Sequence, residues 1–227
     1  MCGRYTLAAP DPAQLRVRFP IGERLEIRRR FNVAPGDDVL AIVRERDAEP
    51  PSGALLRWGL VPHWAHDPRE IAVKTINARA ETVAQRPAYR DAFERRRCLI
   101  VADGFFEWSA GTPHWITRDD GEPFAFAGLW ASWRPPDQRD VEPLRTCSIV
   151  TTAAAGPVRE LHDRMPVILD AGDEPLWLDP ATPAGELHAL LARTEPHLRL
   201  RPVSRAVNDA RHDAPDCLDP PEQTSLF

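Results

Sequence analysis

Apolar and polar positions alternate in many short runs along the chain, and this pattern predicts short β-strands rather than long helices. Two runs, CLIV beginning at Cys98 and CSIV beginning at Cys147, are apolar enough to indicate buried strands. The predicted strands cover residues 3–8, 39–43, 54–60, 98–102, 105–109, 114–118, 123–133, 146–152, 166–169 and 198–203, and residues 76–79 are expected to be extended or loop-like.

Helical patterns are fewer and shorter. Predicted helices cover residues 11–19, 81–85, 88–96, 157–161 and 183–193, and Pro87 separates the second from the third. The turn Asp119-Asp120-Gly121 predicts a hairpin between the strands on either side of it. We therefore expect an α+β fold: one β-rich domain over residues 1–207, a barrel or sandwich flanked by short helices, then a loop or tail over residues 208–227.

Composition limits the class of protein. The chain has 227 residues, 43% of them hydrophobic, with no apolar run near the ~20 residues that span a bilayer and no signal peptide. Four cysteines lie far apart without CxxC spacing, which argues against a zinc site or a disulfide framework. We expect a cytoplasmic protein, nucleoid-associated if it binds DNA, with no metal, cofactor or membrane partner.

The net charge of −5 argues against a surface coated for non-specific nucleic-acid binding, although a local basic groove is compatible with it. Almost all positive charge is arginine, which suits phosphate contacts but also fits a GC-rich genome. Lys74 is the only lysine. An amine nucleophile, if the protein uses one, is therefore Lys74 or the α-amine.

Removal of Met1 would leave Cys2 with a free α-amine and a thiol two carbons apart. The thiol can attack an acyl carbon, as in hydrolases with an N-terminal nucleophile. Alternatively, the amine can condense with an aldehyde, and the thiol can then close a five-membered thiazolidine intramolecularly. The simplest alternative is that Cys2 is only a small second residue.

Two further side chains are candidates for proton transfer. Glu107 stands among aromatic residues, where desolvation would raise its pKa and make it an acid or base; an exposed strand glutamate is the alternative. His162 lies between charged neighbours just before a strand and could shuttle protons, or it could be an ordinary surface histidine.

A second group of residues suits nucleic acid. Arg79 lies on the short segment that begins with Asn77, could grip phosphate with both guanidinium nitrogens, and is followed by Arg86. Trp64 could stack on a base, whereas Trp58 is expected in the core. The HxxH pair of histidines at 63 and 66 lacks a third ligand.

Five segments, taken together and in order, resemble the SOS response-associated peptidase (SRAP) family. They are residues 1–5 (MCGRY), 58–64 (WGLVPHW), 77–81 (NARAE), 102–108 (ADGFFEW) and 161–166 (LHDRMP). The resemblance implies a single β-rich domain that binds single-stranded DNA at abasic sites. It also implies self-removal of Met1 and a thiazolidine bond between Cys2 and the ring-opened sugar.

The resemblance also implies a role for each matching residue. Cys2 would be the nucleophile, Asn77 would hold the terminal amine or the sugar, and Glu107 would be the acid/base. His162 would assist proton transfer and reversal of the crosslink. The DNA-binding residues would be Arg4, Trp64, Arg79 and Arg86, where Arg86 would substitute for a basic residue that some relatives carry at position 87.

Two other functions stay open: a cysteine peptidase or amidase that uses Cys2, Glu107 and His162, and a non-catalytic DNA-binding module in which Cys2 is incidental. The last five residues, QTSLF, resemble the peptide by which bacterial repair proteins dock on the sliding clamp. A clamp is therefore a candidate partner through Gln223, Leu226 and Phe227. We expect the protein itself to be a monomer.

Overall fold

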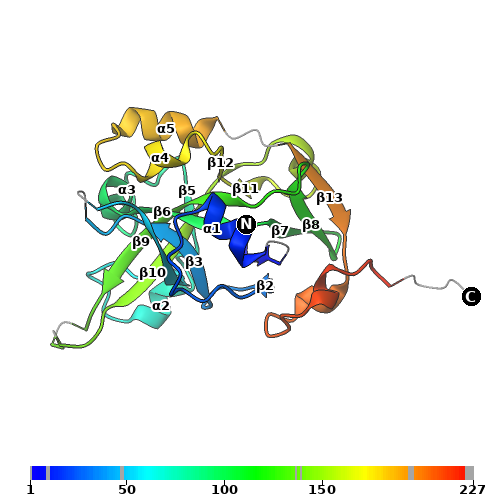
Figure 1. Ribbon diagram of the computed structural model, residues 1–227, viewed down its shortest axis with the longest axis horizontal. Coiled ribbons are helices and arrows are strands. Elements are labelled where there is room, and N and C mark those ends of the chain that lie inside the picture. Colours follow the sequence, from blue (N-terminus) through cyan, green and yellow to red (C-terminus); the bar gives the residue numbers. More distant parts are fainter. Residues whose placement is uncertain are drawn as a thin grey trace, which may run out of the picture.

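Two β-sheets make up most of the structure, with short helices around them (Figure 1). The computed structural model describes residues 2–8, 11–46, 49–135, 137–138, 140–193 and 197–222. The strands are β1 (Tyr5–Leu7), β2 (Arg30–Val33), β3 (Asp38–Val43), β4 (Ser52–Trp58), β5 (Asn77–Arg79), β6 (Arg97–Ala102), β7 (Gly104–Ser109), β8 (Thr112–Arg118), β9 (Phe124–Trp133), β10 (Leu144–Ala153), β11 (Arg164–Pro166), β12 (Ile168–Leu169) and β13 (Leu198–Pro202). The helices are α1 (Pro12–Arg18), α2 (Pro68–Ala72), α3 (Arg90–Arg95), α4 (Glu174–Leu178), α5 (Ala184–Ala192) and the 3-10 helices η1 (Gly156–Glu160), η2 (Arg205–Asn208) and η3 (Pro215–Leu218).

Five strands of the larger sheet close into a barrel in the order β10-β4-β3-β6-β9 and back to β10. The pairing that closes it, β9 with β10, is antiparallel over a long register from Leu144↔Trp133 to Ile149↔Gly128. β10 and β4 run parallel, with Thr146 opposite Arg57. Closure removes the free edges that an open sheet of this size would expose.

Alternate residues of the barrel strands point inward and form one apolar cluster. Its members on these strands are Val39, Ala41, Val43, Ala54, Leu56, Trp58, Cys98, Ile100, Ala102, Phe124, Phe126, Trp130, Cys147 and Ile149. Gly128 makes room inside this narrow space, because a Cβ there would lie 2.7 Å from the sulfur of Cys98. The predicted burial of Cys98, Cys147 and Trp58 is confirmed.

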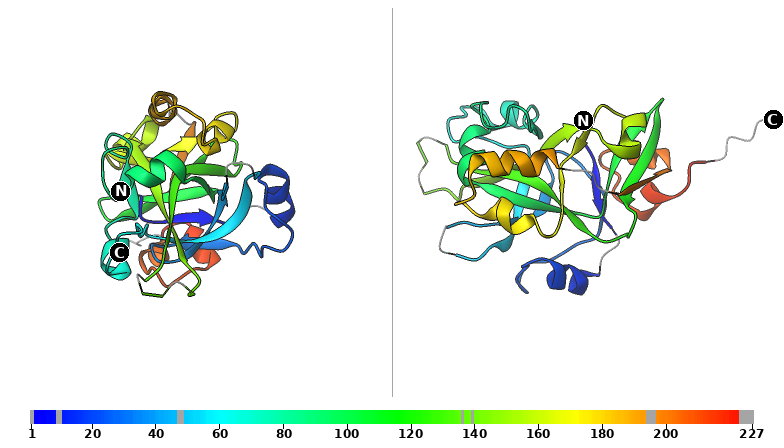
Figure 2. Two further views of the ribbon diagram at one scale, coloured as in Figure 1. Left: turned by 90° about the vertical axis from the view of Figure 1, so that its left-hand side faces the viewer. Right: turned by 90° about the horizontal axis from the view of Figure 1, so that it is seen from above.

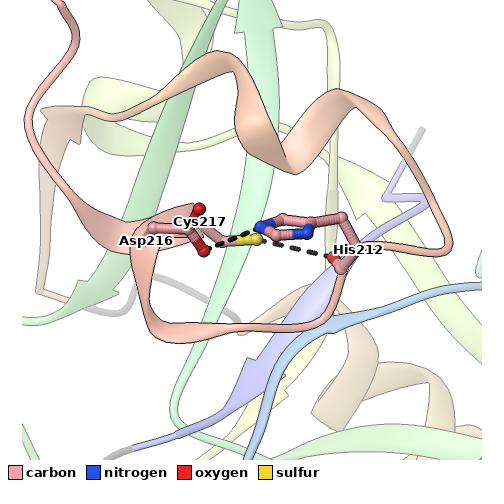
Figure 3. A group of neighbouring side chains, drawn as sticks. All are labelled: His212, Asp216 and Cys217. Carbon is pink, nitrogen blue, oxygen red and sulfur yellow. Dashed lines mark hydrogen bonds and ion pairs between the residues drawn. The ribbon is translucent and has the colours of Figure 1, made fainter.

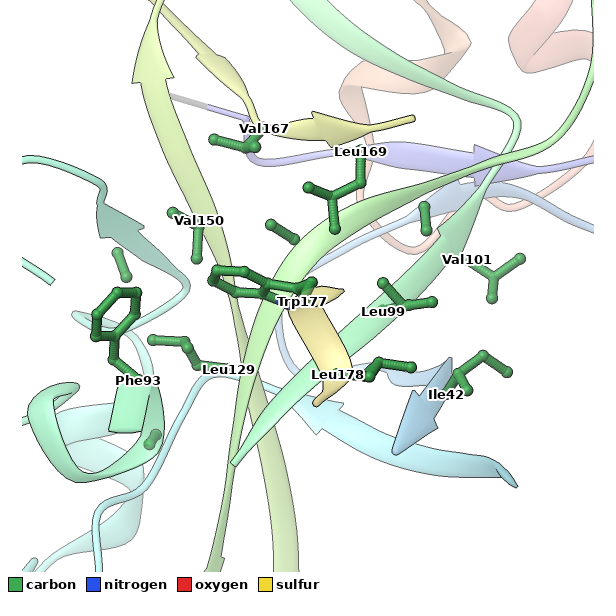
Figure 4. Packing of buried hydrophobic residues seen from close by; sticks show 14 of the residues in the cluster. Ile42, Phe93, Leu99, Val101, Leu129, Val150, Val167, Leu169, Trp177 and Leu178 are labelled. Carbon is green, nitrogen blue, oxygen red and sulfur yellow. The ribbon is translucent and has the colours of Figure 1, made fainter. Parts of the chain in front are cut away.

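The residues in between point outward, where helices cover them (Figure 4). Trp177 of α4 is completely buried in this second cluster and donates a hydrogen bond from Nε1 to the carbonyl oxygen of Cys98 at 2.9 Å. Phe93 of α3 packs beside it, with ring centroids 6.1 Å apart. The β-rich α+β fold expected from the sequence is confirmed: a barrel with short helices packed on its outer face.

The smaller sheet has the strand order β13-β8-β7-β1-β2. β1, from the start of the chain, lies between β7 and β2 and pairs with both in antiparallel register. In Figure 2 the dark blue strand β1 lies among green strands, and its neighbour β7 comes about 100 residues later in the sequence. Tyr5 of β1 packs edge-on against Trp58 and Phe126 of the barrel interior. The beginning of the chain is therefore held where the two sheets meet.

Some local predictions are wrong. The turn at Asp119-Asp120-Gly121 exists, but β8 and β9 belong to different sheets, so it joins the sheets and does not close a hairpin. Residues 81–85 form turns, not a helix. Helices α2 and α4 and strand β2 were not predicted. In the segment expected to be loop or tail, the 3-10 helix η3 buries Cys217. No helix in the described part of the chain has the length and apolar character that crossing a bilayer requires.

Candidate functional site

Cys2 lies just before β1 and is completely buried. Its carbonyl oxygen accepts a hydrogen bond from Nδ2 of Asn77 at 2.8 Å, and its thiol lies 3.8 Å from the carbonyl oxygen of Arg4. Burial raises the pKa of the Cys2 thiol far above its usual range, and the nearby charge of Glu107 raises it further. The sulfur is therefore held as a neutral thiol.

Glu107 reaches this place because β7 runs antiparallel beside β1. Tyr5 faces Phe105, and the amide of Phe106 donates to the carbonyl oxygen of Arg4 at 3.0 Å, so the next residue of β7 lies beside the start of β1. Glu107 is only 3% exposed, and burial raises the pKa of its carboxyl group, while the charge of His162 opposes that rise. The predicted raised pKa among aromatic residues is confirmed in direction.

Asn77 comes from the other sheet. It begins β5, which runs parallel to β10 with Asn77 opposite Ile149. The hydroxyl of Tyr89 donates to the Asn77 carbonyl oxygen at 2.9 Å and helps to hold the strand. The Oδ1 atom of Asn77 is buried and has no hydrogen-bond partner in the described part of the chain. It is thus a fixed acceptor next to Cys2.

His162 lies between η1 and β11, with its side chain 30% exposed. Its Nδ1 atom is 2.9 Å from the backbone nitrogen of Arg164 and 2.8 Å from a carboxylate oxygen of Asp163. A neutral ring can accept the amide proton at Nδ1, whereas a protonated ring can donate to Asp163. Both protonation states of this histidine therefore have a partner, as a proton-transfer group requires.

A groove with a volume of about 500 Å³ opens next to these residues. Its lining includes four residues that were predicted from the sequence as site or DNA-binding residues: Asn77, Trp64, Arg79 and Arg86. Trp64 is 46% exposed, unlike the buried Trp58, so its indole face is accessible. The remaining lining residues are Lys74, Thr75, Thr82, Pro87, Ala88 and Tyr89. Cationic and aromatic side chains along one groove suit a single strand of nucleic acid.

Arg4 lies apart from this groove lining. Its guanidinium donates to Oδ1 of Asn32 at 2.8 Å and to the backbone oxygens of Val207 at 2.6 Å and Asn208 at 3.4 Å. In this structure Arg4 ties β1 to β2 and to the segment after β13. A phosphate contact from Arg4 stays a prediction.

Arg164 is a structural member of the site that sequence reasoning did not select. Its guanidinium forms two hydrogen bonds with the carboxylate of Glu81, at 2.5 and 3.0 Å, and a third with the carbonyl oxygen of Thr151 at 2.7 Å. It thereby joins the His162 segment to the segment that carries Asn77 and Arg79. Arg164 is part of a quoted motif, but nothing in the sequence indicates that its partner is Glu81.

The tertiary structure therefore brings Cys2, Asn77, Glu107 and His162 to one place, beside a groove lined by Trp64, Arg79 and Arg86. This fold and site define a barrel protein with a buried cysteine at the start of its first strand, next to a protonatable carboxyl group, an amide and a histidine. The sequence profile of the family described as "SOS response associated peptidase (SRAP)" matches residues 1–210, and the chain belongs to this family.

Curated relatives agree with this assignment. The chain is 36% identical over 229 residues to "Abasic site processing protein YoqW" of Bacillus subtilis (strain 168), which covers 96% of this chain and 99% of the relative. It is 35% identical over 208 residues to "Abasic site processing protein HMCES" of Gallus gallus, covering 78% of this chain and 61% of that protein.

Solved structures share the fold. A protein from Bordetella bronchiseptica has a TM-score of 0.74 and 28% identity, covering 89% of this chain and 100% of that one. A protein from Bacteroides thetaiotaomicron has a TM-score of 0.81 over 96% of this chain and 99% of that one; at 24% identity it supports the fold alone.

Proposed function

We propose that this protein acts on abasic sites in single-stranded DNA and joins itself to them through Cys2 once Met1 has been removed. The observation that supports it best is the hydrogen bond of Cys2 with Asn77 and its closeness to Glu107. Asn77 also lines the groove that holds Arg79 and the exposed Trp64. The names of the relatives, abasic site processing proteins, support this choice of substrate.

The proposed reaction has two bond-forming steps. The α-amine of Cys2 attacks the aldehyde of the ring-opened sugar and expels one water to form an imine. The thiol then adds across the imine: sulfur bonds to carbon, the thiol proton goes to nitrogen, and a thiazolidine results. Because burial keeps the thiol neutral, the amine acts first and the sulfur second.

The surrounding residues fit the proton transfers in this scheme. Glu107, with its raised pKa, would donate a proton to the ring oxygen during sugar opening and to the departing hydroxyl during imine formation. The free acceptor on Asn77 would orient the terminal amine. His162 would relay protons and assist reversal, and Arg79 and Arg86 would hold phosphates.

The test is the intact mass of the purified protein before and after incubation with single-stranded DNA that carries one abasic site. We expect loss of Met1, then a gain equal to the DNA minus one water, and no gain for Cys2→Ala. DNA with an unmodified base at the same position is the control. A wild-type protein that loses Met1 and forms no adduct would contradict the proposal.

Self-removal of Met1 belongs to the same proposal. Alanine at position 2 is small enough for ordinary aminopeptidases, so Cys2→Ala separates the two routes. Retention of Met1 in Cys2→Ala supports self-removal through the cysteine. Loss of Met1 from this variant assigns the step to an aminopeptidase.

The alternative, a peptidase or amidase acting on external substrates, needs an activated sulfur. Burial of Cys2 works against a thiolate, and this observation favours the aldehyde reaction. Turnover of peptide or amide substrates that depends on Cys2 would reverse this preference. The proposal also includes that the protein is monomeric and is associated with the nucleoid in the cytoplasm.

Docking on the sliding clamp is a separate proposal. The residues concerned, Gln223, Leu226 and Phe227, lie outside the described residues. It rests on the sequence QTSLF alone. A synthetic peptide of this sequence should bind purified clamp, and replacing both Leu226 and Phe227 with alanine should abolish binding.

A further inference from the structure

A group of metal-ligating side chains lies outside the site described above. His212, Asp216 and Cys217 each present one ligand atom, and these three atoms lie within 4.8 Å of one another (Figure 3). Nε2 of His212 is 2.7 Å from Oδ1 of Asp216, and the sulfur of Cys217 is 3.5 Å from the backbone oxygen of His212. Figure 3 shows the imidazole, the carboxylate and the thiol meeting inside one loop.

The loop that carries this cluster is held firmly. Asn32 donates from Nδ2 to the carbonyl oxygen of His212 at 2.7 Å. Asp213 accepts hydrogen bonds from the backbone amides of Phe31 at 2.6 Å and Asn32 at 2.9 Å. The helix η3 has proline in its first turn and buries Cys217 completely. Little conformational entropy would be lost on binding an ion here, because the ligands come from one short, ordered segment.

The donor set suits a borderline metal ion. Thiolate, imidazole and carboxylate are the usual zinc ligands, and three protein ligands with one open position form a common type of zinc site. Zinc bonds of about 2.0–2.3 Å need ligand atoms about 3–4 Å apart, so shifts of roughly 1 Å would suffice here. Binding would release the Cys217 thiol proton to the buffer, and Nε2 of His212 would turn from Asp216 to the metal.

We propose that His212, Asp216 and Cys217 form a binding site for Zn²⁺, with water in the fourth position. The spacing H-x₃-D-C matches neither CxxC nor HxxH, so the sequence alone predicts no metal site here. The proposal is independent of the function proposed for Cys2.

The position of the site suggests what the ion would stabilise. The carbonyl oxygens of Val207, Asp209 and His212 all accept from Nδ2 of Asn32, and Val207 also accepts from Arg4. An ion at the start of η3 would close the loop 212–217 and hold the segment that anchors Arg4 and β1. The ion would therefore stabilise the loop 212–217 and its contact with Asn32.

The test uses Co²⁺ as a spectroscopic substitute for Zn²⁺ on the purified full-length protein. We expect one equivalent of Co²⁺ to produce a thiolate charge-transfer band that Zn²⁺ displaces. Cys217→Ser should lose the band. Cys2→Ala should keep it, which excludes a chelate of Co²⁺ at the N-terminal thiol as its source; the thiols of Cys98 and Cys147 are buried in the barrel. Zn²⁺ should raise the Tm of wild type and of Cys2→Ala.

A further variant guards against misfolding of Cys217→Ser. Asp216 is half exposed, so Asp216→Asn should fold normally and bind Zn²⁺ at least tenfold more weakly than wild type. The exposed pair His63→Ala/His66→Ala should bind Zn²⁺ as wild type does. Absence of the cobalt band in wild type, or its survival in Cys217→Ser, would overturn the proposal. So would unchanged zinc affinity in Asp216→Asn.

Discussion

At the scale of single residues, burial does not by itself distinguish Cys2. The buried thiols of Cys98 and Cys147 also have raised pKa values, for the same reason of desolvation. What sets Cys2 apart is its position next to the terminal amine, its hydrogen bond with Asn77 and the nearby charge of Glu107. A thiol that stays neutral until the imine has formed suits the proposed reaction better than a thiolate, because a thiolate would react with oxidants or metals.

Glu107 should make stability depend on pH in a direction that follows from its raised pKa. The folded state keeps this carboxyl protonated at pH values where the unfolded chain has already lost the proton. Stability from this group is therefore present below the ordinary pKa of 4.5 and declines as pH rises through the folded pKa. Glu107→Gln should thus gain unfolding free energy relative to wild type as pH rises from 4 to 8, by about 1.4 kcal/mol for each pKa unit, and its Tm advantage should grow over that range.

The control for this prediction has the opposite sign. Arg164 lowers the pKa of Glu81, so Glu81→Gln should lose Tm relative to wild type as pH rises from acid to about pH 5, and the difference should stay constant above that. Thermal melts of wild type, Glu107→Gln and Glu81→Gln at several pH values test both predictions. If the Tm values of Glu107→Gln and wild type changed with pH in parallel, a raised pKa of Glu107 in the folded state would be ruled out.

At the scale of elements, β10 is the strand that assembles the site. It pairs with β9 and β4 in the barrel, with β5, which carries Asn77 and Arg79, and with β11, which follows His162. Arg164 of β11 adds a side-chain link, because its guanidinium bonds to Thr151 of β10 and to Glu81, which follows β5. The relative position of Asn77 and His162 is thus set by backbone pairing and by one guanidinium.

Arg164→Lys tests that link. Lysine keeps the charge but cannot form the paired bonds to Glu81 and also reach Thr151. We expect a loss of about 1–3 kcal/mol in unfolding free energy, because the Arg164 side chain is only 13% exposed, and a crosslinking rate at least tenfold lower. The control is Arg118→Lys, whose arginine forms a similar pair with Asp120 away from the site.

Urea unfolding and the rate of mass gain with abasic DNA measure both effects. Arg118→Lys should lose less than about 1 kcal/mol and crosslink at the wild-type rate. If the two lysine variants crosslink equally fast, Arg164 has no positioning role.

Helix α4 offers a second test at this scale, directed at the fold. Trp177 is completely buried against the barrel, whereas Leu176 on the same helix is 36% exposed. Trp177→Ala should reduce the unfolding free energy by about 3–5 kcal/mol through lost burial and a cavity. Leu176→Ala should change it by less than about 0.5 kcal/mol in the same urea titration. Similar losses would show that α4 does not cover the barrel as described.

At the scale of the whole molecule, net charge and local charge differ in sign. The chain carries −5 overall, yet the groove beside Cys2 is lined by Lys74, Arg79 and Arg86 without an acidic residue among the described lining side chains. In the proposed function, acidic residues elsewhere would repel DNA from other surfaces, and the groove would attract a phosphate backbone locally. The proposed covalent bond would then remove the need for high equilibrium affinity.

Salt dependence of binding should reveal these groove contacts. Replacing both Arg79 and Arg86 with alanine should weaken binding to single-stranded DNA of any sequence and reduce the slope of log affinity against log salt by about 0.7 per lost phosphate contact. Arg28→Ala is the control, since Arg28 is exposed but lines a different cavity. Fluorescence anisotropy at several salt concentrations gives the slopes. An equal change in slope for Arg28→Ala would place the DNA elsewhere.

Local pattern was sufficient to predict most strands, because alternation reflects which face of a strand is buried. Residues 39–43, 98–102 and 146–152 were correctly predicted as strands, and the aromatic setting of Glu107 was enough to predict its raised pKa. The sequence by itself also identified Cys2, Asn77, Glu107 and His162 as candidates, and the structure brings them together. Their catalytic roles stay predictions.

Only the tertiary structure decided the remaining features, since they depend on which strands pair. The turn at Gly121 has hairpin chemistry, yet its two strands pair with other partners and enter different sheets. Glu81 and Arg164 are 83 residues apart, and only the pairing of β5 and β11 with β10 makes them an ion pair. Long-range contacts likewise decide the partners of Arg4, which are Asn32 and Val207, and hold the loop 212–217 against Asn32. Sequence sets the chemistry of each residue and the burial of each strand, whereas long-range pairing determines which residues meet.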